Sequence, residues 1–475
     1  MLFPTIDFAL FFLAAFALCW VLSPFPTPWK LAVLGLSYFF YGWWEPKFVL
    51  LLVAETAIAH VGARMITRAR DDRTARLWKI AAVGSLLGIL GYFKYAGFFA
   101  VSIDNVARSV GLGNLIPLIQ PTLPLAISFF TFMAISYVID VARDELDPAS
   151  PIDLAVYLAF FPHLIAGPIV RGSELLPQIR RRRDEKHIDY SRAIHLIVRG
   201  LFKKVVISSF LATAIVDPVF VSPSGHSALD VLFGIWGYAI QIYCDFSGYT
   251  DIAIGLALLL GIKFPVNFDA PYSAVSLQDF WRRWHITLSR WLRDYLYIPL
   301  GGNRGSEGEI ARNILLTMIL GGLWHGAAWT FLAWGTLHGV GQVVGHRRRE
   351  ARVAAGKPPQ TTGLIAHIGH VVWTFQFVCL AWVFFRATSF TNAFEVLGRL
   401  FSGWGSPTTL VTPLVILAIV AVLAVQQFPG VLGARLAAWW SHQHLALQAS
   451  LLALVLLGVT TLGPTGVAPF IYYRF

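Results

Sequence analysis

The chain has 475 residues, of which 56% are hydrophobic and 13% are charged. Soluble domains carry roughly 25% charged residues, so this composition excludes a soluble globular protein. The formal net charge is +11, but the basic residues flank hydrophobic segments instead of covering a folded face, which excludes a nucleic-acid-binding protein. We expect a polytopic membrane protein that contacts lipid and binds no nucleic acid.

Apolar segments long enough for membrane helices recur along the whole chain. The first segment has neither a basic flank nor a small-residue cleavage site, so we expect it to be retained as a span. No Ser/Gly-rich linker and no fixed-period repeat divides the sequence, and we expect one domain over 1–475. The expected spans are 8–22, 30–44, 48–66, 80–100, 121–141, 193–216, 229–262, 365–386, 410–427 and 447–463.

Basic residues gather in four blocks, at 64–79, 180–186, 282–293 and 346–352. The positive-inside rule places such blocks on the cytoplasmic side. The first block follows the third expected span, so the N-terminus is predicted outside the cytoplasm, and successive spans then place the second and third blocks inside. Membrane topology alone accounts for the first and fourth blocks.

The segment 152–169 is apolar but short, and Pro162 and Pro168 interrupt it. We predict a re-entrant or interfacial piece, which is allowed only where protein buries it. Its histidine, His163, lies at a tight turn and is predicted to be structural.

Two carboxylates, Asp245 and Asp251, interrupt the next long apolar run. Unpaired carboxylates are costly at membrane depth, so both should find hydrogen-bond donors. Three interpretations are open: a structural polar network between helices, a carboxylate that orients a histidine, and a proton or ion path. Both residues are therefore candidate donor-binding residues as well as candidate structural ones.

The segment 276–298 is basic and aromatic, and its apolar residues recur at helical spacing. We predict one amphipathic helix at the cytoplasmic interface, with Ser276 capping its start. It could anchor the protein to lipid, or form a basic mouth for an anionic substrate such as a nucleotide-bearing thioester. His285 on the apolar face favours the mouth, because it needs a partner inside the protein. The candidate donor-binding residues here are Trp281, Arg282 and Arg283.

The tripeptide Trp324-His325-Gly326 lies within the apolar run 310–345. Ionisable groups at membrane depth usually mark a site. A single span over this run would put the fourth basic block outside, and about 36 residues is long for one span at ~1.5 Å per residue. We therefore expect two helical pieces that meet near His325. We predict that His325 is catalytic and that Trp324 contributes to substrate binding.

Sequence motifs of several other functional classes are absent. The chain has no HExxH or paired CxxC motif, and its three cysteines lie in separate spans, so we expect no metal site and no disulfide framework. It has no P-loop, which excludes an ATP-driven pump. A proton-coupled transporter that uses Asp245, Asp251 and His325 is a different-class alternative, although two matching halves with interrupted segments are not visible. A scaffold role would leave His325 unexplained.

Several motifs follow one another in an order that is specific to one family. They are DFSGYTD at 245–251, FPVNF at 264–268, PY at 271–272, FWRRWH at 280–285, LS at 288–289, RDY at 293–295, IPLGGNR at 298–304, GLWHG at 322–326 and PFIYYRF at 469–475. They closely resemble the membrane-bound O-acyltransferase (MBOAT) family, in particular the bacterial branch that contains the alginate O-acetylation membrane subunit. The resemblance is densest over 160–340. Its departures are a missing aromatic residue in 267–270 and a variation at Tyr473-Arg474.

The resemblance implies an all-α fold of about eleven transmembrane helices around a central funnel or tunnel, with added re-entrant and interfacial helices. It implies that His325 matches the catalytic histidine of the family, and that His285 matches the second family histidine. It also implies acyl transfer from a cytosolic thioester to a hydroxyl presented from the other side. In the bacterial branch the acceptor is often a partner protein that passes the acyl group to a cell-surface polymer.

The residues fit this chemistry independently. A thioester is already activated, so the protein needs only to deprotonate a hydroxyl and to align both reactants. A histidine with an ordinary pKa of ~6.5 is a suitable base near neutral pH, and burial favours its neutral form. The oxyanion donors are open, with the indole N–H groups of Trp324 and Trp329 as candidates.

We therefore predict an acyltransferase of the bacterial inner membrane, with acetyl-CoA or another acyl thioester as donor substrate and no bound cofactor. The expected reaction is O-acetylation of an extracellular polysaccharide such as alginate, with a periplasmic protein that accepts or transfers the acyl group. D-alanyl transfer to teichoic acid and peptidoglycan O-acetylation are close alternatives, because they would share these motifs.

Overall fold

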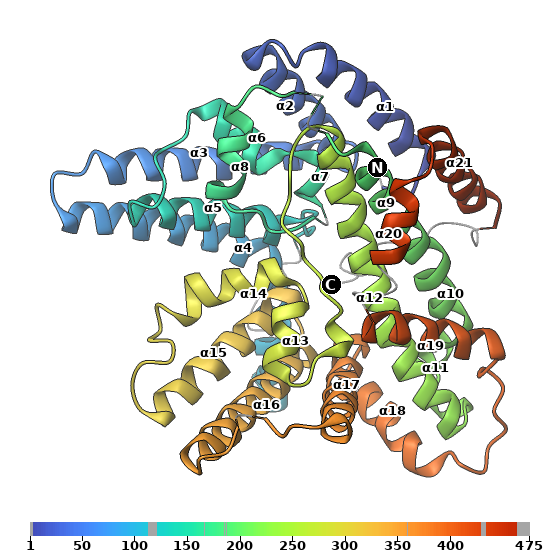
Figure 1. Ribbon diagram of the computed structural model, residues 1–475. Coiled ribbons are helices and arrows are strands. Elements are labelled where there is room, and N and C mark those ends of the chain that lie inside the picture. Colours follow the sequence, from blue (N-terminus) through green and yellow to red (C-terminus); the bar gives the residue numbers. More distant parts are fainter. Residues whose placement is uncertain are drawn as a thin grey trace. The chain divides into compact units, whose positions relative to one another are not determined.

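The fold is known from a computed structural model, which describes residues 3–112, 121–165, 167–184, 186, 188–358, 360–428 and 434–462. Within these ranges the regular secondary structure is helical throughout (Figure 1). This confirms the expected all-α class. The C-terminal motif at 469–475, with the variation at Tyr473-Arg474, lies outside the described residues.

The chain forms two compact units, and helix α12 (Ala228–Leu259) contributes to both. The first unit comprises Met1–Ala193 and Ala253–Pro265, and the second comprises Ile194–Ile252 and Val266–Phe475. The helices of the first unit are α1 (Ile6–Val21), α2 (Pro26–Gly42), α3 (Lys47–Thr67), α4 (Asp72–Ser109), α5 (Ile127–Ala142), α6 (Pro151–Ala159), α7 (Phe161–Leu164) and α8 (Gly172–Arg180).

A continuous helical stretch, Tyr190–Val221, leads from the first unit into the second. It consists of α9 (Tyr190–Leu201), the π-helix η2 (Phe202–Ser208), α10 (Ser209–Leu211), the π-helix η3 (Ala212–Val216) and α11 (Asp217–Val221). The remaining elements are η4 (Pro223–Gly225), α12, η5 (Pro271–Ser273), α13 (Leu277–Arg283), α14 (Ile286–Leu292), η6 (Arg293–Tyr297), α15 (Glu307–His325), α16 (Trp329–Ala354), α17 (Leu364–Arg386), α18 (Phe390–Ser402), α19 (Pro413–Gln427), α20 (Ala434–Ser441) and α21 (Leu445–Leu462).

Five helices of the described chain are long and apolar enough to cross a membrane, and every expected span overlaps a helix. The five are Lys47–Thr67, Asp72–Ser109, Tyr190–Val221, Ala228–Leu259 and Leu364–Arg386. Shorter apolar helices occur at Ile6–Val21, Ile127–Ala142, Pro413–Gln427 and Leu445–Leu454. The chain is therefore a multi-pass membrane protein.

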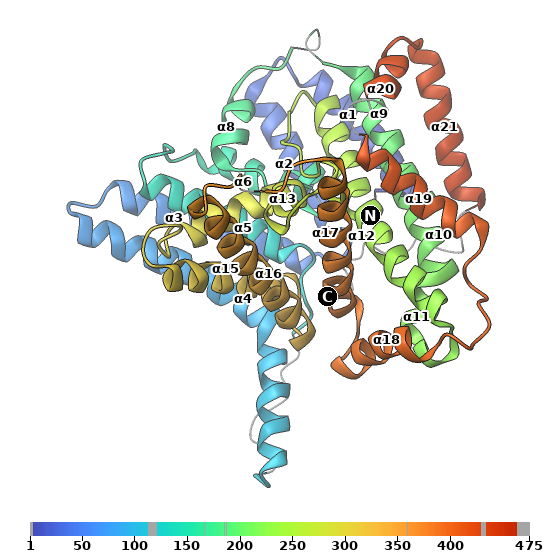
Figure 2. The same cartoon turned by 60° about the horizontal axis from the view of Figure 1, so that its bottom comes forward.

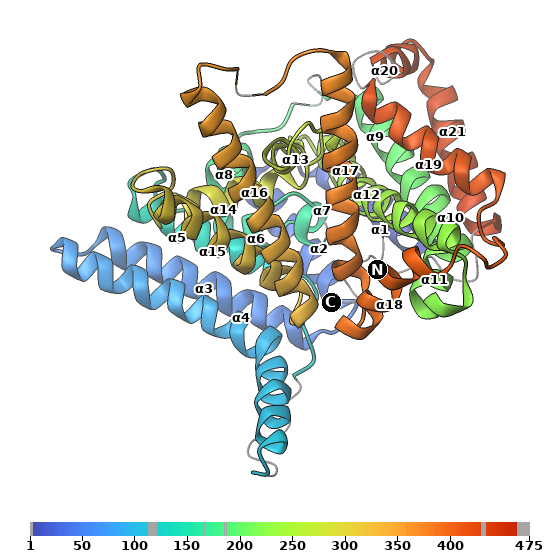
Figure 3. The same ribbon diagram turned by 90° about the horizontal axis from the view of Figure 1, so that it is seen from below.

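In the first unit, α3 and α4 form a close hairpin. An added Cβ at Gly62 would lie 2.5 Å from the Cβ of Ala82, so only glycine allows the observed approach. The expected span 80–100 is part of the longer helix α4, which runs beside α3 and turns away from it in its second half (Figures 2 and 3).

The interrupted segment 152–169 is broken as expected. Helix α6 ends at Ala159, and α7 is a single turn that contains His163. The buried His163 ring lies 5.9 Å from the ring of Phe160 and 5.4 Å from that of Phe264. The ring is thus packed among aromatic side chains, and its structural role stays a prediction.

The prediction of one continuous helix over 276–298 is wrong, because the chain breaks after α13 at Trp284 and His285. The backbone of His285 has φ +42°, in the left-handed region. The preceding extended segment causes the break by pairing with it. The Ile286 N–H donates to the Asn267 carbonyl at 2.9 Å, and the Arg283 carbonyl accepts from the Asp269 N–H at 2.9 Å. These bonds replace the helical ones that a continuous helix would make.

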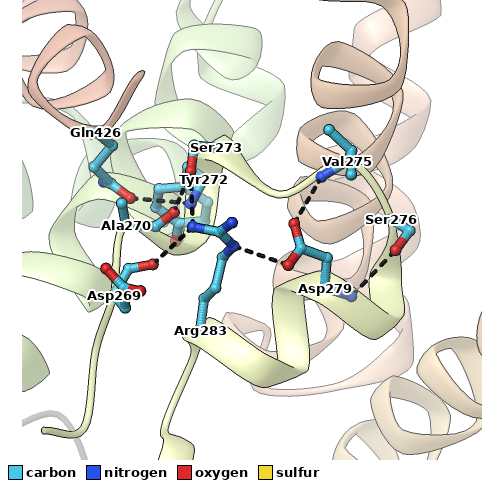
Figure 4. Close-up of polar contacts among 9 residues, drawn as sticks. All are labelled: Asp269, Ala270, Tyr272, Ser273, Val275, Ser276, Asp279, Arg283 and Gln426. Carbon is cyan, nitrogen blue, oxygen red and sulfur yellow. Dashed lines mark hydrogen bonds and ion pairs between the residues drawn. The ribbon is translucent and has the colours of Figure 1, made fainter. Parts of the chain in front are cut away.

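The start of α13 agrees with the prediction. The Ser276 hydroxyl accepts a hydrogen bond from the Asp279 N–H at 3.1 Å, as an N-cap residue should (Figure 4). The apolar face is buried in protein at Trp281, Trp284 and His285, which disfavours a purely lipid-anchoring role.

Helices α15 and α16 confirm the predicted pair of helical pieces, with His325 as the last residue of α15. Small residues bring the two helices together. An added Cβ would overlap the Phe331 carbonyl at Gly322 and the Met318 carbonyl at Gly335. This close packing fixes the position of His325 at the end of the hairpin.

Candidate active site

The indole of Trp324 lies beside both motif histidines. Its ring centroid is 5.0 Å from that of His325 and 6.0 Å from that of His285. All three side chains are buried within the second unit. Residues from the break after α13 and from the end of α15 therefore meet in one aromatic cluster.

The hydrogen bonds around His285 determine its tautomer. The Asn267 side-chain oxygen accepts from the Thr287 N–H at 3.1 Å and lies 3.2 Å from His285 Nδ1. A backbone N–H only donates, so that atom is the amide oxygen, and His285 Nδ1–H must be the donor to it. The lone pair of the neutral ring is then on Nε2. Burial lowers the pKa of His285 to about 3, which keeps the ring neutral at physiological pH.

The ring of His325 is packed edge-to-face among aromatic side chains. The centroids of Trp324, Trp334 and Phe385 lie 5.0, 5.0 and 5.3 Å away, with interplanar angles of 81°, 87° and 69°. The following residue, Gly326, leaves room for the Phe331 ring, which an added Cβ would overlap. Aromatic rings on several sides therefore hold the His325 imidazole in place.

Trp281, a predicted donor-binding residue, belongs to the same cluster. Its Nε1–H donates to His338 Nδ1 at 3.2 Å, and its ring lies 5.7 Å from that of Trp334. His338 and Trp334 are one helical turn apart on α16, and both are fully buried. Neither Trp334 nor His338 was among the site residues expected from the sequence. Their spacing on one helical face, shortly after His325, was the available signal.

The two predicted arginines have different surroundings. The Nε–H of Arg283 donates to Asp279 at 2.9 Å, and its Nη1 lies 3.5 Å from both the Asp269 carbonyl and the Ser273 hydroxyl (Figure 4). Arg283 therefore holds the turn before α13. Arg282 is exposed on the same helix.

The fourth basic block lies next to this helix. The Nη1 of Arg349 on α16 donates to the Gln278 side-chain oxygen on α13 at 2.6 Å. Arg349 and Arg282 thus place two guanidinium groups at one end of the second unit, where the Glu350 carboxylate, 3.7 Å from Arg349, offsets part of the positive charge.

Both buried carboxylates of α12 find donors, as predicted. Asp251 accepts from Arg199 at 2.9 and 2.6 Å and from Lys203 at 2.8 Å. Asp245 pairs with Lys204 and lies 3.4 Å from the Ser208 hydroxyl. These cations come from α9 and η2, so the contacts favour a structural polar network over a histidine-orienting role.

Glycines allow the close helix contact that this network requires. An added Cβ at Gly200 would lie 2.5 Å from the Gly248 carbonyl, and one at Gly248 would lie 2.8 Å from the Gly200 carbonyl. Among the residues that the structure describes, no group of three or more His, Cys, Asp or Glu side chains is arranged to hold a metal ion.

The remaining sequence-based candidate, Trp329, is 55% exposed at the start of α16, whereas Trp324 is buried. This exposure argues against Trp329 as an oxyanion donor in the buried cluster. Both histidines lie against the indole of Trp324, and an imidazole in its neutral form can remove a proton from a hydroxyl.

Comparison with known proteins identifies the family of the chain. Residues 114–386 match the model of MBOAT, the membrane-bound O-acyltransferase family, and this range contains every predicted site residue. The chain is 41% identical over 377 residues to a probable alginate O-acetylase AlgI of Pseudomonas aeruginosa, covering 78% of this chain and 70% of the relative. It is 38% identical over 403 residues to a peptidoglycan O-acetyltransferase of Helicobacter pylori, covering 78% of this chain and 73% of the relative.

A more distant similarity links the chain to a teichoic acid D-alanyltransferase of Streptococcus thermophilus. The identity is 28% over 254 residues, covering 50% of this chain and 61% of that relative. The names of these relatives share acyl transfer and differ in the acceptor.

Proposed function

The chain belongs to the membrane-bound O-acyltransferase family, and on that premise we propose that it transfers an acetyl group from cytosolic acetyl-CoA to a hydroxyl acceptor outside the cytoplasm. The proposed product is an O-acetylated extracellular polysaccharide such as alginate. The observation that carries the proposal is that His285 and His325 both lie against the buried indole of Trp324.

In the proposed reaction His325 is the general base. It removes the proton of the acceptor hydroxyl while that oxygen attacks the thioester carbonyl carbon. The C–S bond then breaks, and the proton passes from His325 to the departing thiolate. The neutral His285, held by Asn267, assists from its position beside Trp324.

The basic end of the second unit is the proposed donor mouth. Arg282 is exposed there, and Arg349 is held beside α13 by Gln278. Guanidinium groups bind phosphate well, and the donor carries several phosphates. Trp281 and Trp324 would then lie along the path from this mouth to His325. About eleven spanning helices around a central funnel would supply such a path.

Similarity favours a polysaccharide acceptor over the alternatives. Identity of about 40% over most of the chain to alginate O-acetylases exceeds the 28% over half of it to a D-alanyltransferase. Peptidoglycan O-acetylation is the second candidate, because the relative with that name is 38% identical. We place the protein in the bacterial inner membrane, with a periplasmic partner that accepts or transfers the acyl group.

The test uses the full chain in an alginate-producing bacterium that lacks its own membrane O-acetylase. Inverted membrane vesicles receive acetyl-CoA with a labelled acetyl group, and the label in the polymer is measured. His325→Ala should lower the rate by at least ~10²-fold, the usual lower value for a general base. His367→Ala, at an exposed histidine of α17, is the matched control.

Each outcome has a defined meaning. Full activity of a membrane-inserted His325→Ala protein would reject the catalytic assignment. Label that enters peptidoglycan instead of alginate would select the second candidate.

A further inference from the structure

Trp334 carries a buried hydrogen-bond donor for which the described residues provide no acceptor. Its side chain is 0% exposed, and its Nε1 has no hydrogen-bond partner in the described part of the chain. Buried polar groups in native proteins are almost always paired, so such a group needs an explanation. An indole N–H only donates, so this group keeps the capacity to bind an acceptor atom that the described residues do not supply.

The position of this donor connects it with the proposed chemistry. The ring of Trp334 lies 5.0 Å from that of His325 at an angle of 87°. A second buried indole, Trp284, is also 0% exposed and also lacks a described partner for its Nε1. The rings around Trp284 are those of Phe268, Tyr272, Phe280 and Trp382.

The Trp334 ring is held firmly on several sides. His338 and Phe385 lie 4.8 and 5.3 Å away, and Trp382 stacks on it at 5.8 Å. His338 is itself fixed by the hydrogen bond from Trp281. A donor that is oriented in advance stabilises developing charge without reorganisation, which is the requirement for an oxyanion site.

We propose that Trp334 Nε1–H donates a hydrogen bond to the thioester carbonyl oxygen as it becomes an oxyanion, an inference that rests on the proposed function. When the acceptor oxygen bonds to the carbonyl carbon, the C=O electron pair moves to the carbonyl oxygen, where the indole N–H stabilises it. The pair returns as the C–S bond breaks, and His325 passes its proton to the thiolate. Trp334 is then a catalytic residue alongside His325.

The test removes the N–H and keeps the aromatic ring. Trp334→Phe and Trp284→Phe are compared in the same vesicles, with the initial rate measured against acetyl-CoA concentration and the protein amount measured by immunoblot. Trp334→Phe should lower kcat by ~10²-fold with KM within about twofold, because an oxyanion donor acts in the transition state. Trp284→Phe should keep kcat within about threefold, since it removes an equally buried N–H from a ring that packs among Phe268, Tyr272, Phe280 and Trp382.

A second substitution separates chemistry from packing. Benzothienylalanine at position 334 replaces the N–H by sulfur in a bicyclic ring of nearly the same shape, and it should reproduce the loss of kcat. Full activity of this variant, or equal losses in the variants at 334 and 284, would overturn the inference.

His325→Ala in the same assay keeps the two proposals distinguishable. An inactive His325→Ala protein together with a fully active variant at 334 rejects the indole donor alone. An active His325→Ala protein rejects the general base as well.

Discussion

Two parts of the second unit contain polar side chains within apolar segments, and the neighbours of these side chains differ between the two parts. At the contact of α12 with α9 and η2, Asp245 and Asp251 are matched by cations. At the end of α15, His325 is surrounded by the rings of Trp324, Trp334 and Phe385.

The difference separates structure from chemistry. A carboxylate that already has its cations contributes to helix packing and has little capacity for a substrate. His325, by contrast, is enclosed by aromatic rings. The Nε1–H of the neighbouring Trp334 has no acceptor among the described residues, so it can still form a hydrogen bond with a substrate. Polar residues within membrane segments therefore indicate a reactive site only when their neighbours are known.

The largest expected effect is a loss of folding stability when the ion-pair network of Asp245 is broken. Lys204→Met leaves the buried Asp245 carboxylate without its main cation, and removal of one partner of a buried pair costs about 3–5 kcal/mol. Thermal unfolding in detergent should show a strongly lowered midpoint, with little change in Lys357→Met at an exposed lysine. The double variant Lys204→Met with Asp245→Leu should recover most of the loss. A stable single variant with selective loss of activity would instead assign this network to the reaction.

The next effect tests the hairpin end. Gly326→Ala adds a Cβ that overlaps the Phe331 ring, so the turn must shift and move His325. Displacement of about 1 Å in a reacting group can cost ~10²-fold in rate. Gly345→Ala on α16 is the control, because an added Cβ there meets nothing within 4 Å. Acetyl transfer in vesicles measures both, and equal rates would show that the turn tolerates the shift.

Acid pH provides a smaller, graded test. The folded-state pKa of His285 is about 3 against an ordinary value of 6.5, so the unfolded chain binds more protons between these values. The contribution of neutral His285 to stability is therefore complete above pH 6.5 and is lost as the pH falls toward 3. Midpoints of thermal unfolding between pH 7.5 and 5 should fall less in His285→Asn than in the wild type. Parallel curves would show that His285 is not a source of acid sensitivity.

The smallest effect concerns the donor mouth. Arg282→Gln removes one exposed positive charge and should raise the KM for acetyl-CoA about threefold with kcat unchanged, and it should weaken the salt dependence of KM. Arg283→Gln offers a contrast, because its guanidinium holds the turn before α13 and its loss should lower the unfolding midpoint. A KM unaffected at both positions would move the donor mouth elsewhere.

The sequence was sufficient for features that depend on length and charge. The break between α15 and α16 followed from basic blocks that had to lie on one side of the membrane, and from a run too long for one span. The helices at the expected spans followed from apolar length alone. The Ser276 cap followed from local backbone chemistry.

Features set by distant parts of the chain were not predictable in this way. The break at His285 depends on pairing with Asn267 and Asp269, and no local pattern encodes that contact. The cation of Asp245 comes from Lys204, 41 residues earlier in the sequence. Trp334 resembled an ordinary apolar residue of a span, and its significance emerged only from its position beside His325.

The left-handed backbone at His285 restricts how the protein can be altered at this position. Among side chains other than glycine, asparagine, aspartate and histidine tolerate this conformation best, whereas β-branched and bulky residues are strained in it. Position 285 therefore has two separate requirements: its residue must tolerate the left-handed backbone conformation, and it must carry an imidazole ring. Asparagine tolerates the backbone conformation but lacks the ring, so His285→Asn tests the role of the imidazole alone. A valine at this position would also strain the turn.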